Sequence, residues 1–403
     1  MIGDVDTAAS ASKRLSPGLN PELLGFTCIS CGTEYPVEDY FEGCPRCLVR
    51  NAPASLTPRY ASEPSVVADQ SRLRMQRYAH WLPYRSWVSL GEGGTSCLSF
   101  PSLADEVKAK TVYIKNEGQN PSGSHKDRVS CLTVTRAADA GYDRIVAASS
   151  GNGGASLALY AAAAGLRCCI VSTPFLSPIF RQAIEMTGAE LLTVEDSLER
   201  WTLIAGMARN EGWFPATNYL NPPVGSNHFG LPGLATIAFE LFEELRGEPL
   251  DAVLVPTSRG DLIWGLYVGF SQLKRLGHVR RLPRLYAVEP YPRIQRVLEG
   301  EAVTGSFPGA TAMTSIGGST VTYQAVQAIR ASGGGAVVVD EQSVMRDQTR
   351  LAHHGCYAEL SSAASLTGLE KLIAEGKLSS GETAVLIATS NGYKDTPAAG
   401  TLA

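Results

Sequence analysis

From about Trp81 onward, short apolar and β-branched runs alternate with longer segments whose apolar positions recur at helical spacing. The runs typical of strands occupy residues 111–115, 144–149, 168–173, 189–194, 251–256, 284–289, 336–340 and 383–389. Helical patterns lie between them, at 126–140, 155–164, 178–187, 198–211, 231–245 and 360–375. Strands alternating with helices predict parallel α/β sheets with crossover helices, and strands with few polar positions suit sheets covered on both faces.

The N-terminal part of the chain does not show this alternation of strand and helix patterns. Residues 1–25 lack an apolar stretch of the kind that a secretory signal needs, so we expect a flexible arm there. Residues 26–50 contain four closely spaced cysteines. Residues 51–76, with Pro53, Pro58, Pro64 and several serines, predict a linker.

Composition and charge exclude several classes of protein. The chain has 403 residues, 44% hydrophobic and 18% charged, which is typical of a globular protein with two or three domains. A net charge of −4 provides no basic field for nucleic acid. The most apolar run, residues 155–166, is too short to span a membrane. We therefore expect a cytoplasmic protein with no nucleic-acid or membrane partner, and the odd count of nine cysteines agrees with a reducing compartment.

The cysteine cluster predicts a metal site. Cys28 and Cys31 form one CxxC pair, Cys44 and Cys47 form a second, and Gly32, Gly43 and Pro45 supply tight turns. Four thiolates at this spacing fill a tetrahedron around Zn²⁺ and leave no open position, so the site would be structural and not catalytic. The alternative is a set of four free or redox-active thiols.

The most informative segment, residues 115–128, reads KNEGQNPSGSHKDR. A strand ends at Lys115, a loop rich in Asn, Gly and Ser follows, and a helix begins near Lys126. Lys126 in its ordinary role would be a solvated residue at a helix start. However, a lysine there opposes the helix dipole, and one reason for the placement is an amine with a lowered pKa that acts as a nucleophile toward an aldehyde.

A second loop, residues 149–156, reads SSGNGGAS between a strand and a helix. Its backbone amides and small side chains suit an anion or a carboxylate. Glycine-rich loops after strands are common, and this one lacks the spacing of the dinucleotide fingerprint, which counts against an NAD-binding domain.

These segments together resemble one enzyme family. NPSGSHKDR is similar to the NPTGSFKDR motif of threonine synthase, and SSGN occurs in the same family. Further along, HHGCYAELSSAASLTGLEKL and ATSNGYKD resemble its EGxFxEPSSAASLAGL and LTGHGLKD segments, and TSIGGSTVTYQAVQAI resembles its TAIRIGNP stretch. The resemblance runs in order from about Arg85 to the C-terminus. It identifies the chain as similar to the threonine synthase-like family of fold type II pyridoxal-phosphate (PLP) enzymes, within the tryptophan synthase beta superfamily.

The resemblance implies a role for each matching residue. Lys126 would hold PLP as a Schiff base and then move the α-proton of the substrate. Asn152 would bind the ring 3-hydroxyl, and Thr389 would face the pyridine nitrogen, where a hydroxyl favours elimination chemistry. The substrate carboxylate would be bound by Ser149, Ser150 and Gly153.

The sequence departs from the family at two places. The turn expected to bind the cofactor phosphate is not rich in glycine and asparagine; it comprises Ser258, Arg259, Gly260, Asp261 and Leu262. Asp261 would repel a phosphate unless it turns away or pairs with Arg259. The second departure is His125, which stands where the family usually has phenylalanine. Its ring is either a packed substitute for that phenylalanine or a substrate contact or proton relay beside Lys126.

The resemblance implies a PLP-dependent lyase or synthase, either a carbon–oxygen lyase or a β-replacement transferase. Its amino-acid substrate would carry a leaving group at the β or γ carbon. A divergent relative acting on a phosphorylated or acylated hydroxy amino acid is the leading hypothesis. The alternatives are threonine synthase proper, which converts O-phosphohomoserine to threonine, a threonine or diaminopropionate type of ammonia-lyase, and a non-catalytic zinc-ribbon binding protein.

The resemblance also implies an architecture. A flexible arm (1–25) and zinc-ribbon-like knuckles (26–50) would precede two αβα domains with parallel or mixed sheets. The large PLP-binding domain would combine residues 51–120 and 226–403, and a small mobile domain would span 121–225. The family is usually dimeric, so a homodimer is expected.

Overall fold

The computed structural model describes residues 18–196 and 198–395, which fold around two main sheets. Residues 1–17 of the expected arm lie outside this description. The larger sheet has six strands, all parallel except the edge strand β6. In spatial order they are β14 (Gly335–Val338), β13 (Arg284–Glu289), β12 (Ala252–Pro256), β15 (Thr383–Ala388), β7 (Thr111–Asn116) and β6 (Cys97–Ser99).

Both faces of the six-stranded sheet are covered, because successive side chains of each strand point to opposite sides. Val253 and Val255 of β12 enter one hydrophobic core, and Leu254 enters the other. The first core is completed by α7 (Thr236–Glu244), α8 (Asp261–Arg275) and α10 (Tyr323–Ser332). The second is completed by α2 (Pro101–Val107), α11 (Glu341–His353) and α12 (Leu360–Ala374). The short helix α9 (Ile294–Leu298) follows β13.

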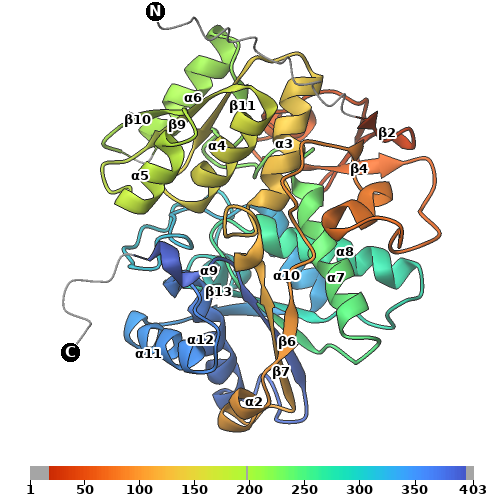
Figure 1. Cartoon of the computed structure of the whole chain (residues 1–403), viewed down its shortest axis with the longest axis vertical. Helices are drawn as coiled ribbons and strands as arrows, with labels where there is room; N and C mark the ends of the chain where they lie inside the picture. The colour runs from red at the N-terminus through yellow and green to blue at the C-terminus, as the bar shows by residue number, and fades with distance from the viewer. Residues whose placement is uncertain (1–17, 197, 396–403) are drawn as a thin grey trace, which may run out of the picture.

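The smaller sheet has four parallel strands in the order β10 (Glu190–Thr193), β9 (Arg167–Ser172), β8 (Arg144–Ala148) and β11 (Phe214–Pro215). Ile145 and Ala147 of β8 face a core shared with α3 (Asp127–Asp139), α4 (Asn152–Ala164) and α5 (Pro178–Glu185). Val146 faces α6 (Glu199–Asn210) on the other side. This sheet and its helices form the upper half of Figure 1, and α2, α11 and α12 lie in the lower half.

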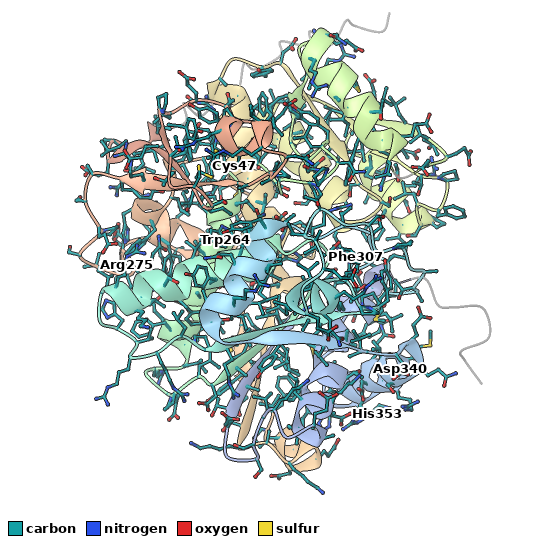
Figure 2. The ribbon with its side chains drawn as sticks, turned by 180° about the vertical axis from the view of Figure 1, so that it is seen from behind. Cys47, Trp264, Arg275, Phe307, Asp340 and His353 are labelled. Atoms are coloured by element: carbon teal, nitrogen blue, oxygen red, sulfur yellow. The ribbon has the colours of Figure 1, made fainter. Side chains whose placement is uncertain are left out.

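The N-terminal segments are more ordered than the sequence indicated. Residues 18–25, expected in a flexible arm, include β1 (Gly18–Leu19), which pairs with β5 (Tyr84–Ser86), and the start of β2 (Leu23–Cys28). Residues 51–76, expected to be a linker, contain β4 (Leu56–Tyr60), which pairs with β2 opposite β3 (Glu34–Tyr35). The linker interpretation was wrong there because Leu56 is buried in the core, despite the neighbouring prolines. Figure 2 shows Cys47, of helix α1 (Pro45–Val49), on the same side of the molecule as Trp264 of α8.

The expected strands all form, and none of their ends differs by more than two residues from the prediction. The helix expected over 231–245 is divided into a 3₁₀ turn, η3 (Leu231–Ala235), and α7, since Pro232 and Gly233 disfavour a continuous α-helix. Further 3₁₀ segments are η1 (Arg74–Trp81), which is kinked at Tyr78, η2 (Glu117–Gln119) and η4 (Gly392–Lys394). Within the described residues, no helix combines the length and the apolar character that crossing a membrane demands.

A buried ionic network ties the start of α3 to the large sheet. The Arg128 guanidinium, fully buried, lies 2.7 Å from a Glu117 carboxylate oxygen and 2.7 Å from one of Glu240. Lys115 Nζ lies 2.8 Å from the other oxygen of Glu240 and 2.7 Å from Glu244. Burial raises the pKa of Glu240, but Arg128 and Lys115 outweigh burial and hold that pKa far below its ordinary value. Both buried cations of the network therefore have carboxylate partners inside the protein.

We expect Arg128→Leu to lower the free energy of unfolding by about 3–5 kcal/mol, because it leaves buried Glu117 without its cation and Glu240 with only one of its two cations. Chemical denaturation of the purified proteins measures the difference. Arg167→Leu is the control, since Arg167 pairs with Glu190 on the surface, where ion pairs stabilise little. Equal stability of Arg128→Leu and Arg167→Leu would contradict the role given to the network.

Candidate active site

Three loops at the carboxyl ends of strands meet beside Lys126. His125 N donates to Thr389 O at 3.0 Å, which joins the loop after β15 to the start of α3. Ser390 Oγ donates to Asn152 Oδ1 at 3.2 Å, which adds the loop after β8. The charges that act on Lys126 include Asp261 and Arg259, which follow β12. The sequence-predicted residues of 125–126, 149–153, 258–262 and 389 are thus brought together at one place, where crevices in parallel α/β folds bind ligands.

Lys126 lies immediately before α3 and is held there by its neighbours. Asp127 accepts hydrogen bonds from Ser122 N and Ser156 Oγ, both at 2.6 Å, and Arg128 is clamped in the buried network. Burial lowers the pKa of Lys126, while Asp261 opposes that shift and Arg259 adds to it. A lysine with a lowered pKa has more of its amine in the neutral, nucleophilic form.

The turn after β12 forms an anion cradle. Within the described part of the chain, the backbone N–H groups of residues 258–262 donate to no acceptor. They lie at the N-terminus of α8, where the helix dipole favours negative charge. Gly260 is required there: its φ is +107°, and a Cβ would lie 2.2 Å from Ala325 Cβ of α10. These donors fit a phosphate group although the turn is not rich in glycine.

Asp261 and Arg259 do not pair with each other. Asp261 accepts hydrogen bonds from Ser226 Oγ and, at 2.7 Å, from Gln324 Nε2, so its charge is bound on the side of α10. Arg259 Nε donates to Thr320 Oγ1 at 3.2 Å, and its guanidinium lies 5.0 Å from the ring centre of Trp201. The carboxylate that looked unfavourable in the sequence is therefore turned away by specific partners.

Asn152 and Thr389 both have side-chain partners. Asn152 begins α4, and its amide contacts Glu359, Ser390 and Lys394. Thr389 Oγ1 lies 2.8 Å from Ser362 Oγ of α12, and its side chain is buried. The resemblance assigned Asn152 and Thr389 to a cofactor ring. Thr389 is bonded to His125, the residue before Lys126, and Asn152 is bonded to Ser390, the residue after Thr389.

The loop after β8 presents a second set of donors. The backbone N–H groups of residues 150, 152 and 153 have no acceptor among the described residues. Ser149 Oγ accepts from Gly154 N at 2.8 Å, which holds the loop in its turn. Ser150 Oγ accepts from Arg200 Nη1 at 2.7 Å. This geometry suits a carboxylate, the group expected for Ser149, Ser150 and Gly153.

His125 is bound to the backbone. Its Nδ1 lies 3.2 Å from Thr389 O, and since a carbonyl only accepts, Nδ1 carries the hydrogen. Burial holds the pKa of His125 well below its ordinary value, and the nearby charge of Lys126 lowers it further. The imidazole is therefore neutral and its orientation is fixed by this bond.

The four knuckle cysteines converge. Their Sγ atoms all lie within 4.8 Å of one another, with Cys28–Cys47 and Cys31–Cys44 each at 3.7 Å. Tetrahedral zinc with bonds of about 2.3 Å places its sulfurs about 3.8 Å apart. The cluster therefore fits zinc, and it lies outside the cleft.

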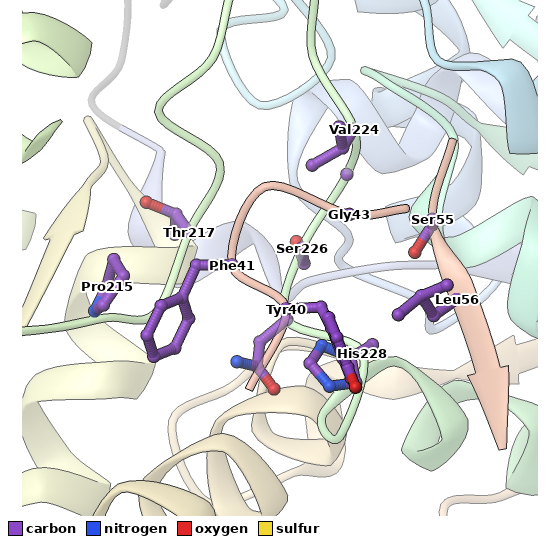
Figure 3. Close-up of a pocket in the computed structure, with 12 residues that line it drawn as sticks. Tyr40, Phe41, Gly43, Ser55, Leu56, Pro215, Thr217, Val224, Ser226 and His228 are labelled. Atoms are coloured by element: carbon purple, nitrogen blue, oxygen red, sulfur yellow. The ribbon is translucent and has the colours of Figure 1, made fainter. Parts of the chain in front are cut away.

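A separate hollow lies between the knuckles and residues 215–228 (Figure 3). Tyr40, Phe41 and Gly43 line it from the knuckle side, and Val224 and Ser226 from the other. It contains neither Lys126 nor the cradle of residues 258–262, so we do not assign the reaction to it.

The sequence analysis missed three residues of the cleft: Glu359, Lys394 and Arg200. Glu359 and Lys394 stand inside the motifs that carried the family resemblance, which was their signal. Lys394 has no partner that the sequence reveals, because Asn152 is distant along the chain. Arg200 stands on α6 with no motif around it, and only the fold places it beside Ser150.

Comparison with known proteins gives a consistent set of similarities. Residues 88–390 match the family described as pyridoxal-phosphate dependent enzyme. The chain is 30% identical over 383 residues to threonine synthase of Methanosarcina acetivorans, covering 91% of both chains. It is 30% identical over 387 residues to threonine synthase of Methanocaldococcus jannaschii, covering 92% of this chain and 93% of that one.

A solved structure is similar in fold. An L-serine ammonia-lyase from the fungus Rhizomucor miehei superposes with a TM-score of 0.65 and 20% identity, covering 77% of this chain and 96% of that one. At this identity the likeness concerns the arrangement of sheets and helices.

Proposed function

The chain belongs to the family of pyridoxal-phosphate dependent enzymes, and from that premise we propose that its substrate is an amino acid with an esterified hydroxyl group. As the resemblance predicted, it is a threonine synthase-like enzyme of fold type II that performs PLP-dependent elimination or replacement. The family match sets aside the non-catalytic alternative. The finer proposal names the leaving group: inorganic phosphate, released from a phosphate ester at the β or γ carbon.

The residues of the cleft would have separate roles in cofactor binding, proton transfer and substrate binding. PLP, when bound, withdraws electrons from the α carbon of an amino acid and so acidifies its hydrogen. Lys126 would hold the cofactor and then carry that proton, since its lowered pKa favours the neutral amine. The N–H groups of residues 258–262 would bind the cofactor phosphate, and Thr389 would face the ring nitrogen. Ser149, Ser150 and Gly153 would bind the substrate carboxylate.

The observation that carries the choice of leaving group is a pair of guanidinium groups, Arg200 and Arg259. Arg200 reaches the carboxylate loop through Ser150, and Arg259 packs on Trp201, the residue after Arg200. Burial lowers the pKa of Arg259 to about 10, and the charge of Arg200 contributes to this shift. Two partly buried cations on one side of the cleft favour a multiply charged anion there. A phosphate ester supplies that charge, whereas an acetyl ester does not.

Threonine synthase proper is the second candidate, favoured by the names of the curated relatives. O-phosphohomoserine carries its phosphate on the γ carbon and O-phosphoserine on the β carbon. The departures at Arg259, Asp261 and His125 favour a divergent relative. An ammonia-lyase releasing a keto acid remains the third alternative.

A substrate panel tests the proposal. We expect the wild-type enzyme to release inorganic phosphate from O-phosphoserine or O-phosphohomoserine and to act poorly on O-acetylserine and threonine. Arg259→Met, assayed at saturating PLP, should lower kcat/KM for the phosphate ester about 10–100-fold, because charged hydrogen bonds contribute about 1.5–3 kcal/mol. The effect on O-acetylserine should be much smaller.

Two controls accompany the panel. Arg259→Lys keeps the charge and should recover part of the loss, and Lys126→Ala should abolish turnover of every substrate. Equal loss for phosphate and acetyl esters in Arg259→Met would refute the leaving-group assignment. Retained turnover in Lys126→Ala would refute the role of the lysine.

We also propose that the cysteine cluster binds structural zinc. The sulfur spacings support this, and all four positions of a tetrahedron are filled by thiolates. The knuckles pack against residues that reach the phosphate cradle: a Cβ on Gly43 would lie 3.1 Å from Val224 Cγ1. Ser226, two residues later, holds Asp261. Zinc would therefore hold the segment from Val224 to Ser226 in place and, through Ser226, the position of Asp261 at the cradle.

The zinc proposal predicts one zinc ion per chain by metal analysis of the purified protein. Cys44→Ser should lose the ion and lower the melting temperature, because metal binding is coupled to folding of the knuckles. Cys97→Ser, outside the cluster, is the control and should keep the metal. A wild-type protein free of zinc, with an unchanged melting temperature after chelation, would leave the thiol alternative.

The remaining expectations are proposals of the same kind. We propose that residues 121–225 form a small domain that moves against 51–120 and 226–403 on substrate binding, and that the enzyme is a homodimer. A cytoplasmic location agrees with nine unbridged cysteines.

A further inference from the structure

Lys394 brings a second lysine amine into the cleft. It ends η4, five residues after Thr389, and donates from Nζ to Asn152 Oδ1 at 2.6 Å. Its side chain passes so close to Gly123 that a Cβ there would lie 2.9 Å from Lys394 Cε. The loop leading to Lys126 therefore has glycine where Lys394 must pass.

The contacts of Asn152 determine which way its amide points. An ammonium only donates and a carboxylate only accepts. The amide atom that accepts from Lys394 is therefore Oδ1. The amide atom that lies 2.7 Å from Glu359 Oε2 is Nδ2. Ser390 Oγ lies 3.2 Å from Oδ1 and shares its one hydrogen between Oδ1 and Gly123 O, at 3.0 Å. The orientation of the amide is thus imposed by two charged groups on opposite sides.

The second hydrogen of Nδ2 has a weaker acceptor than the first, one that a cofactor oxygen would replace. The first is directed to Glu359, and the other contact of Nδ2 is a long one, 3.3 Å to Ser315 Oγ. The Ser315 hydroxyl itself donates to Glu359. A ring oxygen of a bound cofactor would therefore meet an N–H and not a carbonyl oxygen.

We propose that Lys394 and Glu359 are positioning residues that hold Asn152 with an N–H toward the cofactor ring oxygen, and that their opposite charges balance each other across the amide. The inference rests on the proposed assignment of Asn152 to that oxygen. It gives an electrostatic role to Lys394 and Glu359, which the proposed function left without one.

The surroundings of Lys394 support the role. Among the described residues no carboxylate lies within ion-pair distance of its ammonium, and Asn152 is its hydrogen-bond acceptor. The ammonium lies 5.9 Å from the ring centre of Phe180. Burial lowers the pKa of Lys394 to about 8, while Glu359 and Asp127 oppose that shift. A charge held there without a direct counter-ion acts strongly on a neighbouring oxygen.

The two charges have opposite expected effects on the bound cofactor. With Lys394 removed, Glu359 acts alone and disfavours the anionic ring oxygen. With Glu359 neutralised, Lys394 acts alone and favours it. Ionisation of that oxygen changes the visible absorption of bound PLP, which is independent of the substrate.

The test compares Lys394→Met, Glu359→Gln and the double variant, each reconstituted with PLP at one fixed pH. Lys394→Met should weaken PLP binding roughly 10-fold, the effect of losing one charged hydrogen bond, and should reduce the long-wavelength band. Glu359→Gln should also weaken binding but retain or increase that band. The double variant should return the band toward that of the wild type.

Controls separate this outcome from general damage. Lys371→Met removes an exposed lysine of α12 that bonds Val338 O and should change neither reading. Lys394→Arg keeps the charge and should recover part of the band. Borohydride reduction followed by peptide mapping should place the label on Lys126 in the wild type and in Lys394→Met.

The proposal is overturned if Lys394→Met binds PLP within twofold of the wild type with an unchanged spectrum. It is also overturned if Lys394→Met and Glu359→Gln shift the band in the same direction. Absence of a label on Lys126 in the wild type would instead refute the proposed function, so the two failures are distinguishable.

Discussion

The buried ion pairs of Arg128 are the constraint on which the cleft depends. Arg128 follows Lys126 by two residues, and its guanidinium joins Glu117, just after β7, to Glu240 of α7. Helix α3 packs in the core of the smaller sheet, whereas β7 is a strand of the larger sheet and α7 packs against that sheet. Because unpaired buried charges are so unfavourable, these contacts fix where α3 begins. That position sets where the Lys126 amine enters the cleft.

Around that fixed point, the cleft is an arrangement of balanced charges. Asp261 is bound by Ser226 and Gln324, which leaves the N–H groups at the start of α8 for an anion. On the other side, Glu359 and Lys394 face each other across the Asn152 amide. Lys126 lies between these sets of charges, and both Asp261 and Glu359 act on its pKa. Its amine is therefore surrounded by groups that the fold has already oriented.

The knuckles are connected to the cleft through one packed segment. His228 Nε2 lies 3.0 Å from Glu38 O, and Gly43 packs on Val224. Ser226, between these two contacts, bonds Asp261 at the cradle. The N-terminal segment thus acts as a support for the loop after β12. This explains physically how a metal cluster outside the cleft would bear on cofactor binding.

The sequence by itself determined the alternation of strands and helices, the spacing of the four knuckle cysteines and the motif residues Lys126, Asn152 and Thr389, because periodicity and short motifs are local properties. It placed the family correctly for the same reason. It did not predict that residues 18–25 and 51–76 would contain strands, since β1 and β4 exist only by pairing with β5 and β2. Nor did it predict Lys394 beside Asn152, or Arg200 beside Ser150. Such contacts join residues far apart in the chain: the first depends on how the two halves of the fold meet, and the second on how α6 packs against β8 within the smaller half.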